Sequence, residues 1–265
     1  MYTDADVALV RRMDQLARGG MALSRAAKLS LDEFAGGSIA AQADVPYAPL
    51  LAALLEFDEE RALAAWQAVA KGRDIVALLD RIVSPLMIAV GEGWHRGEVS
   101  VAQEHFASEF VRSRLEAIGQ QVCPSPASKA VVVACLPGED HDLAPLMLAT
   151  VLRLTGLRSI FLGRNVPIDD LAYAVEDTGA GIVALHATTG EAGALLTDCA
   201  KRLNNTRTRP AIVYGGQYFD ENAAQQNENE EQHGPRSVFY GGNSLGTAIH
   251  IIQQLAERIR PRGMS

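Results

Sequence analysis

The sequence has few cysteines, and neither its cysteines nor its histidines have the local spacing of a metal site. The three cysteines, Cys123, Cys135 and Cys199, are scattered and form no CxxC pair, which argues against a disulfide framework or a zinc site. The six histidines include no HxxxH pair. Any metal would therefore need ligands that the fold brings together from separate segments.

Long apolar runs, a basic excess and a secretory leader are also missing. No apolar run reaches the roughly 18–20 residues that span a membrane. The opening residues, MYTDADVALVRR, lack the basic-then-apolar order of a signal peptide. The formal net charge of −8 disfavours a broad surface for binding nucleic acid. These features predict a cytoplasmic protein that is not inserted in a membrane.

The chain of 265 residues, 48% of them hydrophobic, is predicted to form three parts. Residues 1–45 are a helical segment followed by a linker. Residues 46–126 have apolar residues at helical spacing and no strand-like run, which predicts a four-helix bundle. Within this bundle, Ser84-Pro85 has the pattern of a helix start, and Ser100 with Gln103 has that of a capping box.

Residues 127–265 alternate between short apolar runs and helical patterns. The strand-like runs are 130–136, 159–162, 182–185, 211–214 and 237–240, and the helical patterns are 142–155, 168–178, 190–204 and 244–260. Repeated βα units predict an α/β domain with a doubly wound, flavodoxin-like parallel sheet, which binds ligands beyond the carboxyl ends of its strands. The acidic, amide-rich stretch 220–234 breaks the pattern and is expected to be a mobile insertion.

The stretch LPGEDHDLAP, residues 136–145, lies where the first strand should give way to a helix. A proline inside a helix costs about 3 kcal/mol, so Pro145 requires the helix to begin just beyond His141. His141 is therefore expected to project from a loop, with Glu139 able to accept its second ring N–H. The alternative is a solvated loop whose acids interact with the helix N-terminus. Three acids and the lack of GxGxxG argue against a phosphate loop.

A second group of candidate residues lies in the predicted bundle. Trp94 ends one helical pattern, and Glu104 and His105 lie one turn into the next. A tryptophan, a carboxylate and an imidazole at one junction could cover a large flat ligand. The alternative is a core tryptophan beside a solvated Glu–His pair.

Together the two groups resemble the cobalamin-binding photoreceptors of the CarH type, a family of transcriptional regulators. Trp94, nine further residues and then Glu104-His105 resemble that family's Trp-x9-Glu-His signature. Glu139-Asp140-His141 resembles its Glu-x-His ligand loop, a variant of the Asp-x-His-x-x-Gly motif of corrinoid proteins. The resemblance covers about residues 45–262. It implies a light-responsive sensor that holds adenosylcobalamin. The sequence also shows no nucleophile–base–acid set that would make the chain an enzyme by itself, so we expect that it is not an enzyme.

The resemblance also implies a role for each residue. His141 would be the lower ligand to cobalt in place of the cofactor's own dimethylbenzimidazole, and Glu139 would support the loop, which also contains Asp140. Trp94 and Glu104 would contact the upper adenosyl group, and His105 could coordinate cobalt once that group leaves. The buried nucleotide tail would be lined by His186, Thr188, Gly215, Gly216 and Gly241, with Gly242 in a similar part.

Three features depart from the family pattern. Ala144 stands where the motif usually has glycine, and His186 stands where related proteins commonly have serine. His186 could bond the tail or be satisfied at the strand end. Residues 2–29 resemble the later part of a MerR-type DNA-binding domain without its helix-turn-helix, so either the start is truncated or direct DNA binding has been lost. The output is then expected to involve a transcription-factor partner or a homo-oligomer.

Two other functions fit the same residues. His141 and His105 could equally ligate haem iron, and related folds hold haem or a linear tetrapyrrole such as biliverdin. A corrinoid carrier for methyl transfer has the same order of bundle and βα domain. Carriers usually show Asp-x-His-x-x-Gly, from which Glu139 and Ala144 depart.

Overall fold

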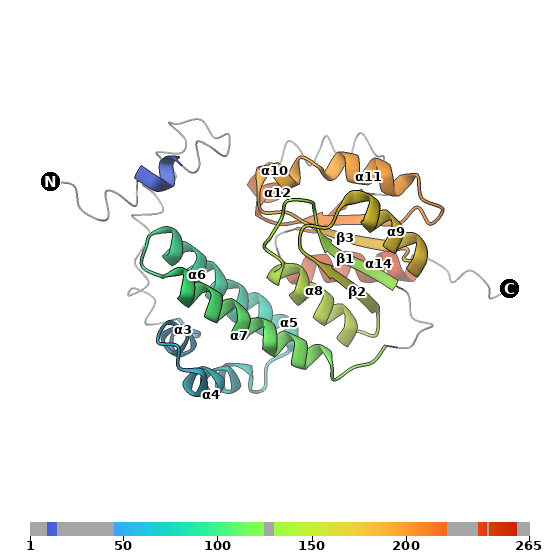
Figure 1. Cartoon of the computed structure of the whole chain (residues 1–265). Coiled ribbons are helices and arrows are strands. Elements are labelled where there is room, and N and C mark those ends of the chain that lie inside the picture. Colours follow the sequence, from blue (N-terminus) through green and yellow to red (C-terminus); the bar gives the residue numbers. More distant parts are fainter. Residues whose placement is uncertain (1–9, 15–44, 125–129, 222–237, 243, 259–265) are drawn as a thin grey trace. The chain divides into compact units, whose positions relative to one another are not determined.

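The computed structural model describes residues 10–14, 45–124, 130–221, 238–242 and 244–258. The predicted N-terminal helices, apart from residues 10–14, and the acidic stretch beyond residue 221 lie outside these residues. The chain divides into two compact units, Met1–Ser113 and Arg114–Ser265, both drawn in Figure 1. The three-part division expected from the sequence stays a prediction.

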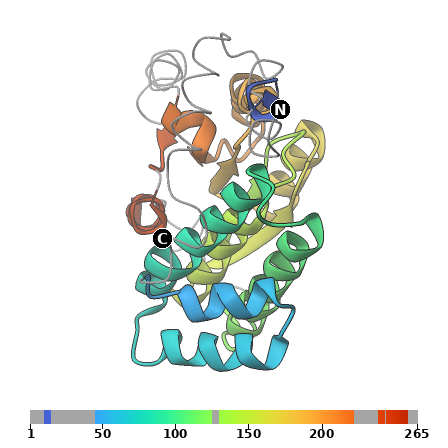
Figure 2. The same cartoon turned by 90° about the vertical axis from the view of Figure 1, so that its left-hand side faces the viewer.

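The first unit is helical, as its apolar spacing predicted. It contains α3 (Ala48–Leu55), α4 (Glu59–Ala70), α5 (Ile75–Leu78), the π-helix η2 (Leu79–Val83), α6 (Ser84–His95) and the first part of α7 (Val101–Gly119). Asp58 and Asp74 cap α4 and α5, because their carboxylates accept backbone N–H bonds from the first turn of each helix. The core residues of this unit include Leu50, Leu54, Leu79 and Leu86. Figure 2 shows the helices of this unit in a second view.

One helix boundary differs from the prediction. Ser84 does not cap a new helix, because α5, η2 and α6 follow one another without a break and Val83 is itself helical. The wide π-type turn lies just before Pro85, whose ring would otherwise clash with a carbonyl group of the preceding turn. The capping box at the start of α7 is confirmed: Ser100 N donates to Gln103 Oε1 at 2.8 Å, and Gln103 N donates to Ser100 Oγ at 3.3 Å.

The second unit contains the predicted parallel sheet. Its strands are β1 (Ala130–Cys135), β2 (Arg158–Gly163), β3 (Ile182–His186), β4 (Ala211–Gly215) and β5 (Val238–Tyr240). They lie in the order β2-β1-β3-β4-β5, and every neighbouring pair is parallel. The chain goes from β1 to β2 on one side and returns to β3 on the other. The direction of winding therefore reverses between β1 and β3, and sheets of this order bind ligands at that reversal.

Helices cover both faces of this sheet (Figure 1). On one face lie α8 (Leu143–Leu154) and α14 (Leu245–Arg258), which pack against Val131 and Val133 of β1. On the other face lie α9 (Ile168–Thr178), α10 (Gly190–Gly193), α11 (Leu196–Asn204) and α12 (Gln217–Glu221), with Val132 and Ala134 beneath them. Because successive side chains of a strand point to opposite faces, β1 is buried throughout. Such burial explains its continuous apolar run.

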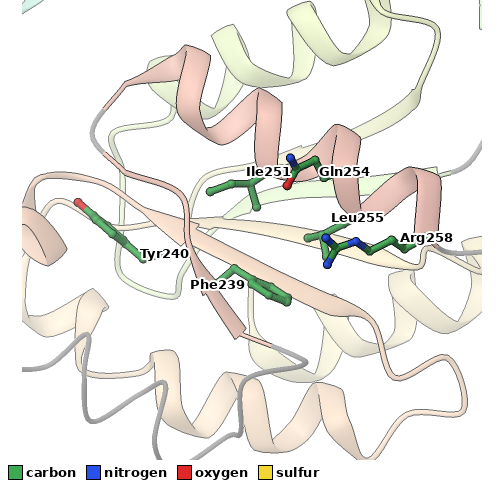
Figure 3. A pocket seen from close by; sticks show the side chains of 6 residues that line it. All are labelled: Phe239, Tyr240, Ile251, Gln254, Leu255 and Arg258. Carbon is green, nitrogen blue, oxygen red and sulfur yellow. The ribbon is translucent and has the colours of Figure 1, made fainter.

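A pocket of about 200 Å³ lies between β5 and α14, at the edge of the sheet. Figure 3 shows its lining side chains, Phe239, Tyr240, Ile251, Gln254, Leu255 and Arg258. None of the residues predicted to bind a ligand is among them. Within the described ranges, no helix is both long and apolar enough to cross a membrane.

Candidate functional site

The loop between β1 and α8 forms one side of the site. It leaves the sheet after Cys135, at the carboxyl end of β1, and contains Glu139 and His141. The residues after β3, which pairs with β1 on the opposite side from β2, form the other side. His141 therefore projects from a loop past the first strand, as the sequence predicted, and the strand order places this loop where the winding reverses.

Glu139 is the anchor of this loop. Its side chain is completely buried, and both carboxylate oxygens accept hydrogen bonds. Oε1 accepts from the backbone N of His141 at 2.8 Å and from its ring Nδ1 at 2.6 Å. Oε2 accepts from the backbone N and the hydroxyl of Thr188, the latter at 2.9 Å, and from the backbone N of Thr189 at 3.2 Å. One carboxylate thus ties the ligand loop to the segment after β3.

These bonds keep Glu139 ionised. Burial alone would raise the pKa of Glu139, but the hydrogen bonds from His141 and Thr188 outweigh burial and lower this pKa to about 2. An ionised carboxylate can only accept, so His141 Nδ1 must carry the ring hydrogen that it shares with Glu139. Nε2 then holds the lone pair of the neutral imidazole.

His141 has the geometry of a metal ligand supported by a carboxylate. Its side chain is 71% exposed although Glu139, which holds it, is fully buried. Thr188 Oγ1 lies 3.0 Å from His141 Nδ1, so the ring is oriented from two directions. An imidazole that donates from one nitrogen to a carboxylate and offers the other to a metal is a common arrangement in metalloproteins. His141 and Glu139 therefore fit a site in which Nε2 of His141 would hold a metal.

Among the described residues, no group of three or more histidines, cysteines or acids could hold a metal ion. Asp140, beside His141, is exposed, and so is Ala144 in the first turn of α8. The solvated-loop alternative does not describe Glu139, whose carboxylate is buried in a network of hydrogen bonds.

Asn165 is a residue of this site that the sequence analysis missed. Its side-chain Oδ1 accepts a bond from Gly138 N at 2.8 Å, and its own N donates to the carbonyl of Glu139 at 2.9 Å. Asn165 has a φ of 50°, in the left-handed region that asparagine tolerates. The available signal was an asparagine just after β2, because β2 pairs with β1 and its carboxyl end lies beside the ligand loop.

His186 is the last residue of β3 and is half-buried. It lies opposite Cys135 of β1 and Gly215 of β4 in the sheet. Burial lowers the pKa of His186 to about 4; the charge of Glu139 acts to raise it and that of His141 acts to lower it further. The imidazole is therefore neutral at pH 7 and contributes volume and hydrogen-bonding capacity rather than charge.

The predicted glycines lie at the ends of β4 and β5, close to protein backbone. A β-carbon on Gly216 would lie 2.3 Å from the carbonyl oxygen of Ala187, so only glycine fits there, and its φ is 117°. A β-carbon on Gly215 would lie 3.0 Å from the carbonyl oxygen of Gly242. Gly241 is buried, and its N donates to Tyr214 O at 2.7 Å. These glycines bring the carboxyl ends of the strands together.

Trp94, Glu104 and His105 belong to the helical unit. The alternative of a core tryptophan is wrong for Trp94, which is 41% exposed at the end of α6. Glu104 Oε2 lies 2.5 Å from His105 Nδ1, and its Oε1 accepts from Ser108 Oγ at 2.8 Å. The His105 side chain is 73% exposed. An aromatic ring and an imidazole are thus presented on the surface of this unit.

Comparisons with known proteins agree with both units. Residues 47–118 match a family described as a B12 binding domain, and residues 129–233 match a second family with the same description. The structure resembles that of the monomethylamine corrinoid protein of Methanosarcina barkeri, with a TM-score of 0.60, 17% identity, and coverage of 78% of this chain and 96% of that one. Fold and site together define a protein of the B12-binding class.

Similar sequences show which B12-binding proteins this chain is related to. The chain is 32% identical to the HTH-type transcriptional repressor CarH of Myxococcus xanthus over 226 residues, which cover 81% of this chain and 75% of that protein. It is 27% identical to trimethylamine corrinoid protein 1 of Methanosarcina acetivorans over 140 residues, 51% of this chain and 65% of that protein. The chain belongs to the CarH-type family of cobalamin-binding transcriptional regulators.

Proposed function

We propose that this chain is a light-responsive sensor that binds adenosylcobalamin and regulates transcription. The observation that carries the proposal is the buried Glu139, which orients His141 at the reversal of winding in the second unit. The relatedness to a CarH repressor along 81% of the chain supports the regulatory part.

In this proposal, His141 would hold the cobalt through Nε2. Glu139 holds the ring hydrogen on Nδ1, which fixes the tautomer and makes Nε2 a stronger donor to a metal. Thr188 keeps Glu139 in place with two further bonds. Adenosylcobalamin, when bound, supplies a cobalt–carbon bond that light can break.

The exposed side chains of the helical unit would respond to the upper group of the cofactor. Trp94 offers a large apolar face and Glu104 a hydrogen-bond acceptor, and these suit an adenosyl group. In this proposal, Trp94 would lose a packing partner if that group left, and His105 could then serve as a ligand to the metal. A local change of this kind can bias a two-state element, with oligomeric state or affinity for a transcription-factor partner as the output.

The test is the absorption spectrum of the purified full chain mixed with adenosylcobalamin, in the dark and after green light, followed by size-exclusion chromatography of both samples. We expect a bound spectrum in the dark, a changed spectrum after light, and a shift in elution volume. His141→Ala should weaken binding by more than the roughly 10–100-fold typical of losing a supporting residue. His250→Ala, an exposed histidine on α14, is the matched control and should bind normally. A His141→Ala spectrum identical to that of the wild type would contradict the ligand assignment.

A second candidate is a corrinoid carrier for methyl transfer. It is favoured by the 27% identity to a trimethylamine corrinoid protein, which covers half of this chain. A carrier would accept a methyl group on bound cobalamin from a partner enzyme and would show no change of elution volume after green light. Light-dependent elution without methyl transfer would favour the sensor.

A further inference from the structure

The ligand loop is held on two sides, by residues that follow the strands on either side of β1. On the β3 side, Thr188 and Thr189 donate hydrogen bonds to the carboxylate of Glu139. On the β2 side, Asn165 bonds to the loop backbone: its N donates to the carbonyl oxygen of Glu139 at 2.9 Å, and its Oδ1 accepts from Gly138 N at 2.8 Å. Glu139 is therefore fixed through its side chain on one side and through its backbone on the other.

Asn165 is itself held firmly by the residues around it. Val166 is buried in the core beneath α9, and Pro167, which precedes the first turn of α9, has a restricted φ. On the other side, Gly163 at the end of β2 pairs with Ala134 of β1. The backbone of Asn165 has a φ of 50°, a left-handed conformation that asparagine adopts more readily than most residues. Asn165 is therefore a fixed point from which the loop can be positioned.

Hydrogen bonds rather than packing hold the loop where Asn165 meets it. Asn165 and Gly138 are both exposed, and a β-carbon on Gly138 would have no neighbour within 4 Å. The contacts at this point are the two bonds with Asn165 and a turn bond from Glu139 N to Leu136 O at 3.1 Å. The Asn165 side chain can therefore be replaced without opening a cavity in the core, and its hydrogen bond can be tested separately from the packing.

We propose that Asn165 is a positioning residue for His141, an inference that rests on the proposed function. Asn165 fixes the backbone at Gly138 and Glu139, and this backbone sets the direction in which the loop presents the His141 ring. Glu139 Oε1 accepts from the backbone N and the ring Nδ1 of His141, at 2.8 Å and 2.6 Å, across only two residues. A small rotation of the Glu139 backbone would therefore turn the imidazole. Asn165 acts on the metal site only through this loop.

Two substitutions separate the side chain of Asn165 from its backbone. Asn165→Gly keeps the left-handed backbone and loses the acceptor for Gly138 N. Asn165→Asp keeps an acceptor and tolerates the same conformation, and its added charge lies at an exposed position. Arg209→Gly is the matched control, because Arg209 also has a left-handed φ, of 47°, and precedes β4 at the end of the sheet opposite to the ligand loop.

The first measurement is amide hydrogen exchange of the full chain without cofactor, followed by NMR. The glycine variant should exchange about fivefold faster at Gly138, the order that one net hydrogen bond supplies, and faster at His141, whose N–H depends on the position of the loop. Exchange at Leu136, whose N–H donates to β3, should stay unchanged. The aspartate variant and the control should exchange like the wild type at all three positions.

The second measurement is an absorption titration of the full chain with hydroxocobalamin in the dark. The glycine variant should raise the Kd by about tenfold, the lower limit for loss of a group that supports a metal ligand. Its spectrum at saturation should equal that of the wild type, because His141 is intact. The aspartate variant should bind almost as tightly as the wild type, and the control should bind equally tightly. A residue that only stabilises the fold would not give this combination of local exchange, affinity and rescue.

Three results would overturn the inference. One is an unchanged Kd in the glycine variant, with Asn165→Ala as a second variant without the acceptor should the glycine variant not fold. Another is exchange that rises equally at Gly138 and Leu136, which would indicate a general loss of stability. The third is binding by the aspartate variant as weak as that by the glycine variant, because an acceptor at residue 165 would then have no effect.

Failure of the proposed function would be recognised separately. In that case the wild type would not bind hydroxocobalamin, or His141→Ala would bind it as tightly as the wild type. Either result would remove the proposed function and the role of Asn165 in it. The exchange rate at Gly138, measured without any cofactor, would still show whether Asn165 holds the loop.

Discussion

Two Glu–His pairs among the described residues look alike in distance and in the exposure of the imidazole, but differ in the burial of the carboxylate. In the helical unit, Glu104 lies 2.5 Å from His105; in the βα unit, Glu139 lies 2.6 Å from His141. Both imidazoles are more than two-thirds exposed, at 73% and 71%. The carboxylates differ, because the Glu104 side chain is 30% exposed and that of Glu139 is fully buried.

This difference distinguishes an imidazole held by one partly exposed neighbour from one that the buried part of the fold holds in place. Glu104 accepts one further bond, from the hydroxyl of Ser108 in the same helix. Glu139 accepts from two backbone groups and a hydroxyl in the segment after β3, far away in sequence. A buried acceptor that satisfies several donors cannot rotate without leaving them unpaired, which is costly. His141 is therefore oriented by the fold, whereas His105 can reorient with little penalty.

Removing each carboxylate in turn should show the difference between the two pairs most clearly, in the free energy of unfolding. Glu139→Ala leaves the backbone N–H groups of Thr188 and Thr189 without their acceptor, and we expect a loss of about 2–4 kcal/mol in the free energy of unfolding. The matched variant Glu104→Ala should change this free energy by about 0.5 kcal/mol or less. Urea denaturation followed by circular dichroism measures both values. Equal losses would mean that the buried network is no stronger than the surface pair.

Acid is expected to lower the free energy of unfolding, because two groups of the βα unit have lowered pKa values. The pKa of His186 is lowered from 6.5 to about 4, so the unfolded chain binds a proton more readily than the folded chain does. The resulting stability is complete above pH 6.5 and is lost as the pH falls toward 4, by about 1–3 kcal/mol. Glu139, with its pKa lowered from 4.5 to about 2, adds a further loss below pH 4.5.

His186→Phe isolates the first of these acid effects. The phenyl ring does not titrate, so unfolding free energies measured in urea between pH 7 and pH 4 should fall less steeply in this variant than in the wild type. Parallel pH profiles for the two proteins would show that His186 is not the group responsible.

The smallest effect is expected at the exposed tryptophan. Trp94→Ala should change the free energy of unfolding by about 0.5 kcal/mol or less, because Trp94 is 41% exposed. Trp66, the other tryptophan, is only 6% exposed and contacts Phe110, so Trp66→Ala should cost about 3–5 kcal/mol. Thermal unfolding of both variants tests the contrast. A large loss in Trp94→Ala would assign this ring to the core after all.

Much of the fold could be predicted because its signals are local. The five apolar runs became the five strands to within a residue or two, since buried parallel strands need continuous apolar sequence. Pro145 fixed the start of α8 near residue 143, and this placed His141 in a loop. Two helix predictions were exceptions: no new helix begins at Ser84, because α5, η2 and α6 are continuous, and the helix after β3 is interrupted. It is broken into α10 and α11, and the short α12 was missed.

The site was harder to predict, because its contacts join distant segments. The pairing of Glu139 with His141 spans two residues and could be expected from the sequence, but its bonds to Thr188 and Thr189 depend on the order of strands in the sheet. The contribution of Asn165 depends on the same order. The packing of His186 against Gly216 depends on a ring rotamer, for which the sequence carries no signal.

The π-helix η2 has a consequence for the far end of its helix. Residues of a regular α-helix follow one another at about 100° around the axis, and a single π-type turn accommodates one residue more than the regular pitch allows. Everything after Val83 is therefore rotated by about that angle relative to Ile75–Leu78. Deleting one residue within Leu79–Val83 would restore the regular α-helical pitch and rotate Trp94 about the helix axis. The direction in which the Trp94 ring points is therefore set by a turn that lies well before it in the helix.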